Sequence, residues 1–141
     1  MDTRLGAVEW GGKRKRTSAD NWRKPTIWNA SAAKASVQRK VFCASLADVF
    51  DNKVPREWRD DLWSLIHATP SLSWLLLTKR PQNIVGFLPS LVTEPHVWLG
   101  ATIENATEAA RRIPHLQAAP AAVRFLPLPR RRSCRCRSPR R

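Results

Sequence analysis

The chain has 141 residues, which is the size of one ordinary domain, and its 43% of hydrophobic residues excludes wholesale disorder. It contains no run of about 18 apolar residues that would cross a membrane and no apolar core of a secretory signal near its start, so we expect a cytoplasmic protein with no membrane partner. The net charge of +14 comes from residues 1–40 and 130–141, each with an excess of +7, whereas residues 41–129 are neutral and give the predicted folded body no general attraction for nucleic acid.

The first 40 residues are basic and polar, and we expect an irregular segment because Pro25 biases Lys24 away from the helical conformation. Tryptophans interleave with the cations, a pattern that binds single-stranded nucleic acid by stacking and phosphate contacts. We favour the other interpretation, in which the indoles anchor the segment to a core. The residues of the alternative nucleic-acid interface are Lys13, Arg14, Lys15, Arg16, Trp22, Arg23 and Lys24.

Residues 41–126 repeat a short apolar run followed by an amphipathic stretch, which predicts a domain of β/α units. The apolar runs predict strands at 41–46, 73–78, 96–102 and 122–126. Continuous apolar runs need cover on both faces, so the sheet should be parallel, with its strands neighbouring in sequence order. The predicted fold class is α/β, with a partial (β/α) barrel-like parallel sheet of about four strands, an incomplete barrel.

The stretches between these runs have helical periodicity. The helix that follows the first strand begins near Pro55, and Arg59 should point away from its apolar face. That apolar face consists of Trp58, Leu62, Leu65 and Ile66. Pro81 opens a short helical segment, and Asn105 with Glu108 three residues later predicts a capped helix.

Polar side chains follow the predicted strands at their carboxyl ends, where parallel α/β proteins bind their ligands. Two carboxylates and a Lys-Arg pair at one edge could bind a charged cofactor or a phosphate. In the simpler interpretation, Asp48 and Asn105 cap a turn and a helix, and the cations are solvated loop charges. The candidate ligand rim consists of Asp48, Lys79, Arg80, Glu104 and Asn105, with Ser45, Thr78 and Thr102 beside them.

The cysteines do not have the spacing of a metal site. Cys134 and Cys136 are too close together for a C-x-x-C zinc motif, and no histidine lies near them. The sequence also has no phosphate-binding glycine loop and no nucleophile elbow. We therefore expect no metal and no cofactor in this chain.

Five blocks occur in an order that is found in a known family: RTSADNWRKPTIWN, VFCASLADVFDNKVPREW, WLLLTKRPQNI, VWLGATIEN and RIPHLQAAPAAVRFL. Over about residues 9–126, the chain resembles a bacteriophage-associated family of unknown function, known as phage protein Gp thirty-seven/sixty-eight or the three-cysteine-motif family. The resemblance implies radical S-adenosylmethionine-like proteins, in which three cysteines near the N-terminus hold an iron–sulfur cluster at the mouth of a barrel.

The chain departs from that family pattern at both ends. It starts after the point where the three cysteines would lie, and Cys43 falls in a predicted strand. The family continues after the block that ends at Leu126 with a Ser-Cys-Glu-Pro-like strand end, whereas residues 127–141 contain only Pro, Leu, Arg, Ser and Cys. We expect this Arg-rich tail to be disordered or out of frame, and a genuine arginine-rich binding tail is the alternative.

The sequence therefore predicts a truncated, phage-related protein without activity of its own. The resemblance implies that its complete relatives depend on an iron–sulfur cluster and S-adenosylmethionine and act on an unknown substrate. The alternative is a small basic protein that binds nucleic acid through residues 13–24 and the tail.

Overall fold

The computed structural model describes residues 16–43, 48–87 and 94–127. Its single four-stranded sheet is parallel and has the strand order β1-β2-β3-β4. The strands are β1 (Arg39–Cys43), β2 (Leu72–Thr78), β3 (Val97–Ala101) and β4 (Val123–Phe125). The predicted α/β class, parallel pairing and sequential strand order are thus confirmed, while residues 44–46 of the first predicted strand lie outside the described residues.

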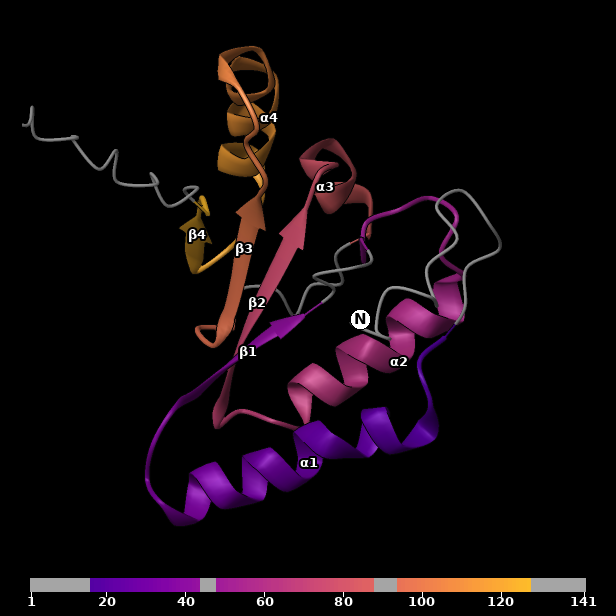
Figure 1. Cartoon of the computed structure of the whole chain (residues 1–141), viewed down its shortest axis with the longest axis vertical. Coiled ribbons are helices and arrows are strands. Elements are labelled where there is room, and N and C mark those ends of the chain that lie inside the picture. Colours follow the sequence, from indigo (N-terminus) through magenta and orange to yellow (C-terminus); the bar gives the residue numbers. More distant parts are fainter. Residues whose placement is uncertain (1–15, 44–47, 88–93, 128–141) are drawn as a thin grey trace, which may run out of the picture.

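Helices connect the strands as the periodicity predicted. The described helices after β1 are α2 (Arg56–His67), the 3₁₀ helix η2 (Pro81–Asn83), α3 (Ile84–Phe87) and α4 (Ala106–Ala118). The strands β2 and β3 point toward α3 and α4, and α1 (Ala19–Lys34) runs across the opposite end of the sheet (Figure 1). This arrangement places the loops that follow β2 and β3 at the end occupied by α3 and α4.

The N-terminal segment corrects one prediction, because α1 lies within the residues that were expected to be irregular. Pro25 lies inside this helix and removes one backbone donor, yet it is buried together with Ala32. The side chain of Asn29 accepts a 2.8 Å hydrogen bond from the backbone of Ser71, just before β2. Packing against the sheet and the alanines of the second half of the helix therefore outweigh the local effect of proline.

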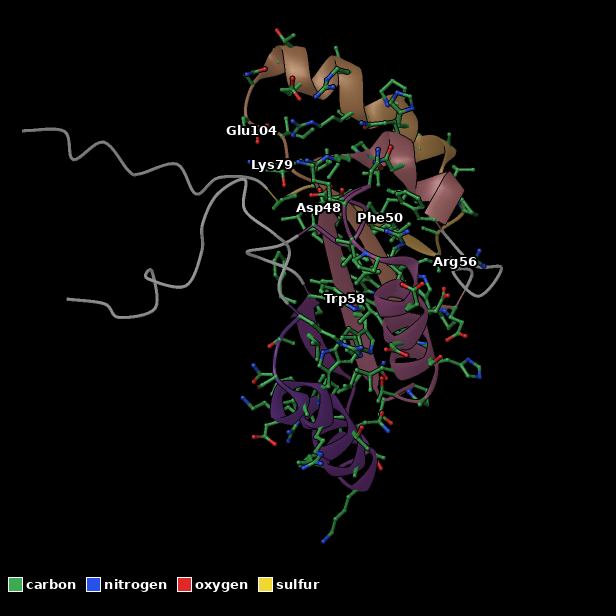
Figure 2. All side chains as sticks on the ribbon, turned by 90° about the vertical axis from the view of Figure 1, so that its right-hand side faces the viewer. Asp48, Phe50, Arg56, Trp58, Lys79 and Glu104 are labelled. Carbon is green, nitrogen blue, oxygen red and sulfur yellow. The ribbon has the colours of Figure 1, made fainter. Side chains whose placement is uncertain are left out.

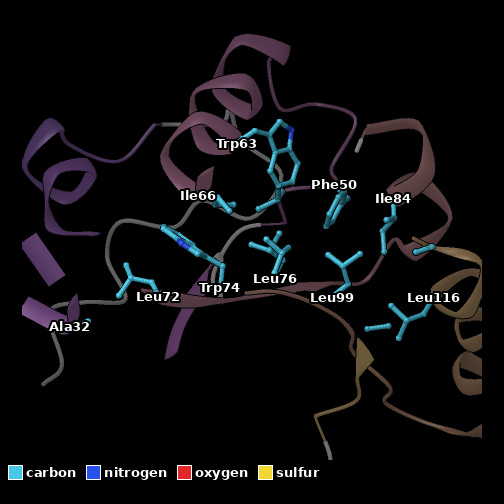
Figure 3. Packing of buried hydrophobic residues seen from close by; sticks show 14 residues of the cluster. Ala32, Phe50, Trp63, Ile66, Leu72, Trp74, Leu76, Ile84, Leu99 and Leu116 are labelled. Carbon is cyan, nitrogen blue, oxygen red and sulfur yellow. The ribbon is translucent and has the colours of Figure 1, made fainter. Parts of the chain in front are cut away.

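The hydrophobic core lies on one face of the sheet. Leu72, Trp74 and Leu76 alternate along β2 and point toward this face, where Trp63 and Ile66 of α2 pack over them (Figure 3). The indole N–H of Trp74 is satisfied by the Thr69 hydroxyl at 3.0 Å. Phe50, Ile84, Leu99 and Leu116 extend the core toward the α4 end.

The other face of the sheet is less covered, and we call it the open face. The strand alternation and the register place side chains of all four strands on it. Its large hydrophobic residues are each half-buried or exposed; they are Phe42, Leu75, Leu77, Trp98, Val123 and Phe125. The buried hydrophobic residues of the described sheet therefore lie on the opposite face alone.

Arg59 corrects a second prediction, which placed it away from the apolar face of its helix. Its side chain is buried and donates a 2.7 Å hydrogen bond to the backbone oxygen of Val54. Its guanidinium also lies 4.1 Å from the centroid of the Phe87 ring. A long apolar stem and five donors let arginine fill this partly apolar site, which helical periodicity alone does not indicate.

Two further predictions concern membrane-spanning helices and the two ends of the chain. In the three described ranges, every helix is too short or too polar to span a bilayer. The residues 128–141 of the predicted tail, and Lys13, Arg14 and Lys15 of the predicted nucleic-acid interface, lie outside the described residues.

Candidate ligand-binding rim

The predicted rim residues lie together at the carboxyl end of the sheet. Lys79 and Arg80 directly follow β2, and Glu104 lies in the loop between β3 and α4. Figure 2 shows Glu104, Lys79 and Asp48 gathered at one end of the sheet beneath α4, whereas Arg56 lies apart from them. Ser45, which was expected beside them, lies outside the described residues.

Asp48 holds the end of β2 in place. One of its carboxylate oxygens accepts hydrogen bonds from the Thr78 hydroxyl at 2.7 Å and from the backbone N–H of Phe50 at 3.0 Å. The other oxygen accepts the backbone N–H of Lys79 at 3.0 Å. Asp48 therefore caps the turn that follows it and also lies at the predicted rim.

The guanidinium of Arg80 lies between two carboxylates. Its Nη1 is 3.4 Å from Asp48 and 3.6 Å from Asp51. Its backbone N–H donates to the Thr78 hydroxyl at 2.9 Å, so that hydroxyl is a donor to Asp48 and an acceptor at the same time. These contacts fix the course of the chain as it leaves β2.

Glu104 joins the end of β2 to α4. It forms an exposed ion pair with the Lys79 ammonium at 3.1 Å and a second one with Arg112 at 2.8 Å. The hydrogen bond from Lys79 is the main cause that holds the pKa of Glu104 below its ordinary value, and the positive charge of Arg112 adds to it. Glu104 therefore remains ionised throughout the neutral pH range.

Arg112 supports this ion pair from within the protein. Its buried side chain donates to the backbone oxygen of Thr102 at 2.6 Å and pairs with Glu108 one turn earlier in α4. Glu108 also pairs with Arg111 at 2.7 Å, which lowers the pKa of Glu108. The pairing on α4 thus orients the Glu104 carboxylate toward Lys79.

Asn105, the remaining predicted rim residue, caps a helix. The side chain of Asn105 accepts a 2.8 Å hydrogen bond from the backbone N–H of Glu108 and so caps α4. Sequence reasoning missed Asp51 and Arg112, because one lies in a predicted turn and the other follows the helical period of a buried stripe. Glu108, four residues before Arg112, was a usable signal, because side chains at this spacing pair on a helix.

The charges of the rim balance each other. Four carboxylates pair with four cations, so the rim has no excess of positive charge. The ion pairs form two groups: Arg80 with Asp48 and Asp51, and the chain of Lys79, Glu104, Arg112, Glu108 and Arg111. A free phosphate would meet carboxylates as well as cations here, so the geometry favours a ligand that carries both signs of charge.

The described residues of the alternative nucleic-acid interface are partly engaged within the protein. Arg16 pairs with Asp61 at 2.7 Å, and its guanidinium lies 4.3 Å from the centroid of the Trp22 ring. Trp22 is half-buried, whereas Arg23 and Lys24 are exposed on α1. Stacking of a base on Trp22 would have to displace Arg16.

The described residues do not offer the ligands of a metal or a cluster. Within 16–43, 48–87 and 94–127, no group of three or more His, Cys, Asp or Glu side chains is placed to hold a metal ion. Cys43 lies at the end of β1, and burial raises the pKa of its thiol to about 12. A thiol with that pKa is a poor source of the thiolate that an iron–sulfur cluster needs.

Comparison with known proteins assigns residues 2–129 to a family whose description is "protein of unknown function (DUF5131)". No curated protein and no solved structure matches the chain.

Proposed function

We propose, from the premise that the chain belongs to the DUF5131 family of proteins of unknown function, that its rim binds the charged end of a small zwitterionic molecule. The observation that carries this proposal is the exposed ion pair between Lys79 and Glu104 at 3.1 Å. An α-amino acid group carries the complementary charges, because its carboxylate can pair with Lys79 and its ammonium with Glu104.

The two partners of this ion pair are held in position without being buried. Asp48 fixes the backbone of Lys79, and Arg112 fixes the carboxylate of Glu104, while 64% and 41% of their side chains are exposed. A salt bridge that is exposed to water contributes little to stability, so opening it for a ligand costs little. A zwitterionic ligand would replace the one solvated ion pair between Lys79 and Glu104 by two ion pairs with the ligand. Both side chains are already held in position before the ligand binds.

The resemblance to a radical S-adenosylmethionine-like family extends this proposal to one ligand. S-adenosylmethionine carries an α-amino acid group, and Lys79 and Glu104 fit the charges of that group. When bound, this cofactor supplies the radical chemistry of such families. The described residues do not offer the thiolates of an iron–sulfur cluster, so we propose binding without catalysis for this chain by itself. The resemblance also extends the proposal to a phage-related origin of the chain.

Isothermal titration calorimetry of the full chain tests the proposal. We expect S-adenosylmethionine and free methionine to bind, and methylthioadenosine, which lacks the amino acid group, to bind at least tenfold more weakly. Lys79→Met and Glu104→Gln should each weaken the binding of methionine by about tenfold, since one charge pair is lost.

Arg56→Gln is the matched control, because it removes an exposed ion pair with Asp60 on α2, away from the rim. It should leave the binding of methionine unchanged. Inorganic phosphate binding as tightly as methionine, or methionine binding that survives both rim substitutions, would show that the rim does not recognise a zwitterion.

A second candidate function is binding of single-stranded nucleic acid, which the exposed cations of α1 favour. Arg23→Gln together with Lys24→Gln should then abolish binding of a labelled oligothymidylate, and the rim variants should retain it.

A further inference from the structure

A pocket of about 370 Å³ lies beside β1, away from the rim. Trp28 of α1 and Leu72 of β2 form part of its wall, and the rest consists of the four successive β1 residues Arg39, Lys40, Val41 and Phe42. Successive residues of a strand point to opposite faces of a sheet. A pocket that contacts all four residues must therefore lie along the edge of β1 and not on one face of the sheet.

That side of β1 is an unpaired strand edge in the part of the chain that the structure describes. β1 pairs with β2 alone, and the backbone N–H of Arg39 donates toward β2, to the oxygen of Ser71 at 3.2 Å. Because hydrogen-bonding directions alternate along a strand, the N–H and C=O groups of Lys40 and Phe42 point outward. This edge can accept a further strand.

The charges at this edge differ from those of the rim. Neither Arg39 nor Lys40 forms an ion pair with any described residue, and Lys40 lies 4.7 Å from the centroid of the Trp98 ring. At the rim, by contrast, every one of the four cations has a carboxylate partner. An anionic group is therefore attracted to the β1 edge, where no described carboxylate offsets the two cations.

Large apolar side chains are also exposed on α1, on β1 and in the loop between them. Ile27 and Trp28 on α1, Val37 in the following loop and Phe42 on β1 are between 42% and 65% exposed. They account for four of the six large hydrophobic residues that are exposed in the described part of the chain. Exposed apolar side chains beside an unpaired strand edge are typical of a site where proteins add a strand from a partner. The positive charges of Arg39 and Lys40 disfavour pairing with a like-charged strand and select one that carries acidic residues.

We propose that the β1 edge binds an extended peptide segment of a partner protein, which adds to the sheet as a fifth strand and carries acidic and apolar residues in blocks. Arg39 and Val41 face one side of the sheet, and Lys40 and Phe42 face the other. Each side thus offers a cation followed by an apolar residue. A parallel partner strand meets them with two acidic residues followed by two apolar residues, and an antiparallel strand carries the same blocks in reverse order.

Fluorescence anisotropy with synthetic peptides tests this inference on the full chain. The probe is a labelled, end-capped peptide with the core Glu-Glu-Val-Phe, and its companion has the reverse core Phe-Val-Glu-Glu. We expect one of the two to bind, and to bind more weakly as the salt concentration rises. A peptide in which lysines replace both glutamates should not bind.

A charge exchange gives the decisive comparison. The double variant Arg39→Glu with Lys40→Glu should bind the glutamate peptide at least tenfold more weakly and should gain binding of the lysine peptide. Amide hydrogen exchange should slow at Lys40 and Phe42 of the wild-type chain when the peptide is added, because their outward N–H groups become paired. Arg56→Gln is the control and should bind the glutamate peptide as the wild type does.

Three outcomes would overturn the inference. A variant with exchanged charges that still prefers the glutamate peptide would show that the edge does not select by charge. An oligothymidylate that displaces the peptide and protects no amide of β1 would assign the surface to nucleic acid. A concentration-dependent dimer with protected β1 amides and no peptide binding would assign it to a second copy of the chain.

Discussion

Gly100 and Phe125 pack against each other across β3 and β4 so closely that a Cβ atom on Gly100 would lie 2.5 Å from Cζ of the phenyl ring. The two residues are register partners on the open face, so the ring of Phe125 rests on the bare backbone of β3. Glycine at this position is a requirement of packing and not of backbone conformation. It ties the short edge strand β4 to the rest of the sheet.

Gly100→Ala should therefore destabilise the protein by about 1–3 kcal/mol, because the ring has to leave its site. The measurement is urea unfolding followed by tryptophan fluorescence. Gly86→Ala in α3 is the control, since a Cβ atom there meets nothing within 4 Å. The double variant with Phe125→Ala should cost less than the two single variants together, and strict additivity would argue against the contact.

Asp48→Asn should lower the free energy of unfolding by about 1–3 kcal/mol, because the neutral amide cannot accept all the donors that the carboxylate accepts from the end of β2. Urea unfolding measures this loss. Asp60→Asn on α2 removes only an exposed pair with Arg56, and it should change the stability by less than about 0.5 kcal/mol. Equal effects of the two substitutions would mean that Asp48 does not organise the rim.

The free energy of unfolding at acidic pH should depend on the ionisation of the rim carboxylates. Glu104 and Glu108 both have a pKa below the ordinary value of 4.5 in the folded protein. Their contribution to stability is therefore present above the unfolded pKa, near pH 4.5, and is lost as the pH falls through the lower folded pKa. Lys79→Met should raise the pKa of Glu104, which a carboxyl-detected NMR titration measures.

Cys43 should react slowly with alkylating reagents while the chain is folded. With a pKa of about 12, its thiolate fraction at pH 8 is about one in ten thousand. In a variant with Cys134→Ser and Cys136→Ser, iodoacetamide labelling followed by mass spectrometry should accelerate by at least a hundredfold when urea is added. Labelling at the same rate with and without urea would show that the thiol is accessible and ionisable in the fold.

The repeated units of the fold could be predicted from the sequence, since continuous apolar runs such as the one that became β2 have few other structures available to them. The predicted range 73–78 differs from the observed Leu72–Thr78 by one residue. The helix α1 could not be predicted by the same means. Its apolar periodicity is weak, and it depends on tertiary contacts such as the hydrogen bond between Asn29 and Ser71.

For the candidate site, too, one aspect could be predicted from the sequence and another could not. The rule that strand ends converge brought Asp48, Lys79 and Glu104 together correctly on one edge. The rule contains no information about which charges pair, because pairing depends on the loop paths and on side-chain rotamers. Arg112 illustrates this, since it reaches the rim from the first half of α4 through its long side chain and is buried there.

The order of the strands also bears on how the chain acquires its structure. Strands that are consecutive in the sequence pair with one another, so no pairing has to wait for a distant segment. Loop closures remain short, and the sheet is able to grow by one β/α unit at a time. During synthesis, β1 and β2 can pair while the residues of β4 are still within the ribosome. The described sheet is complete once the three-residue strand β4 pairs with β3 beside Gly100.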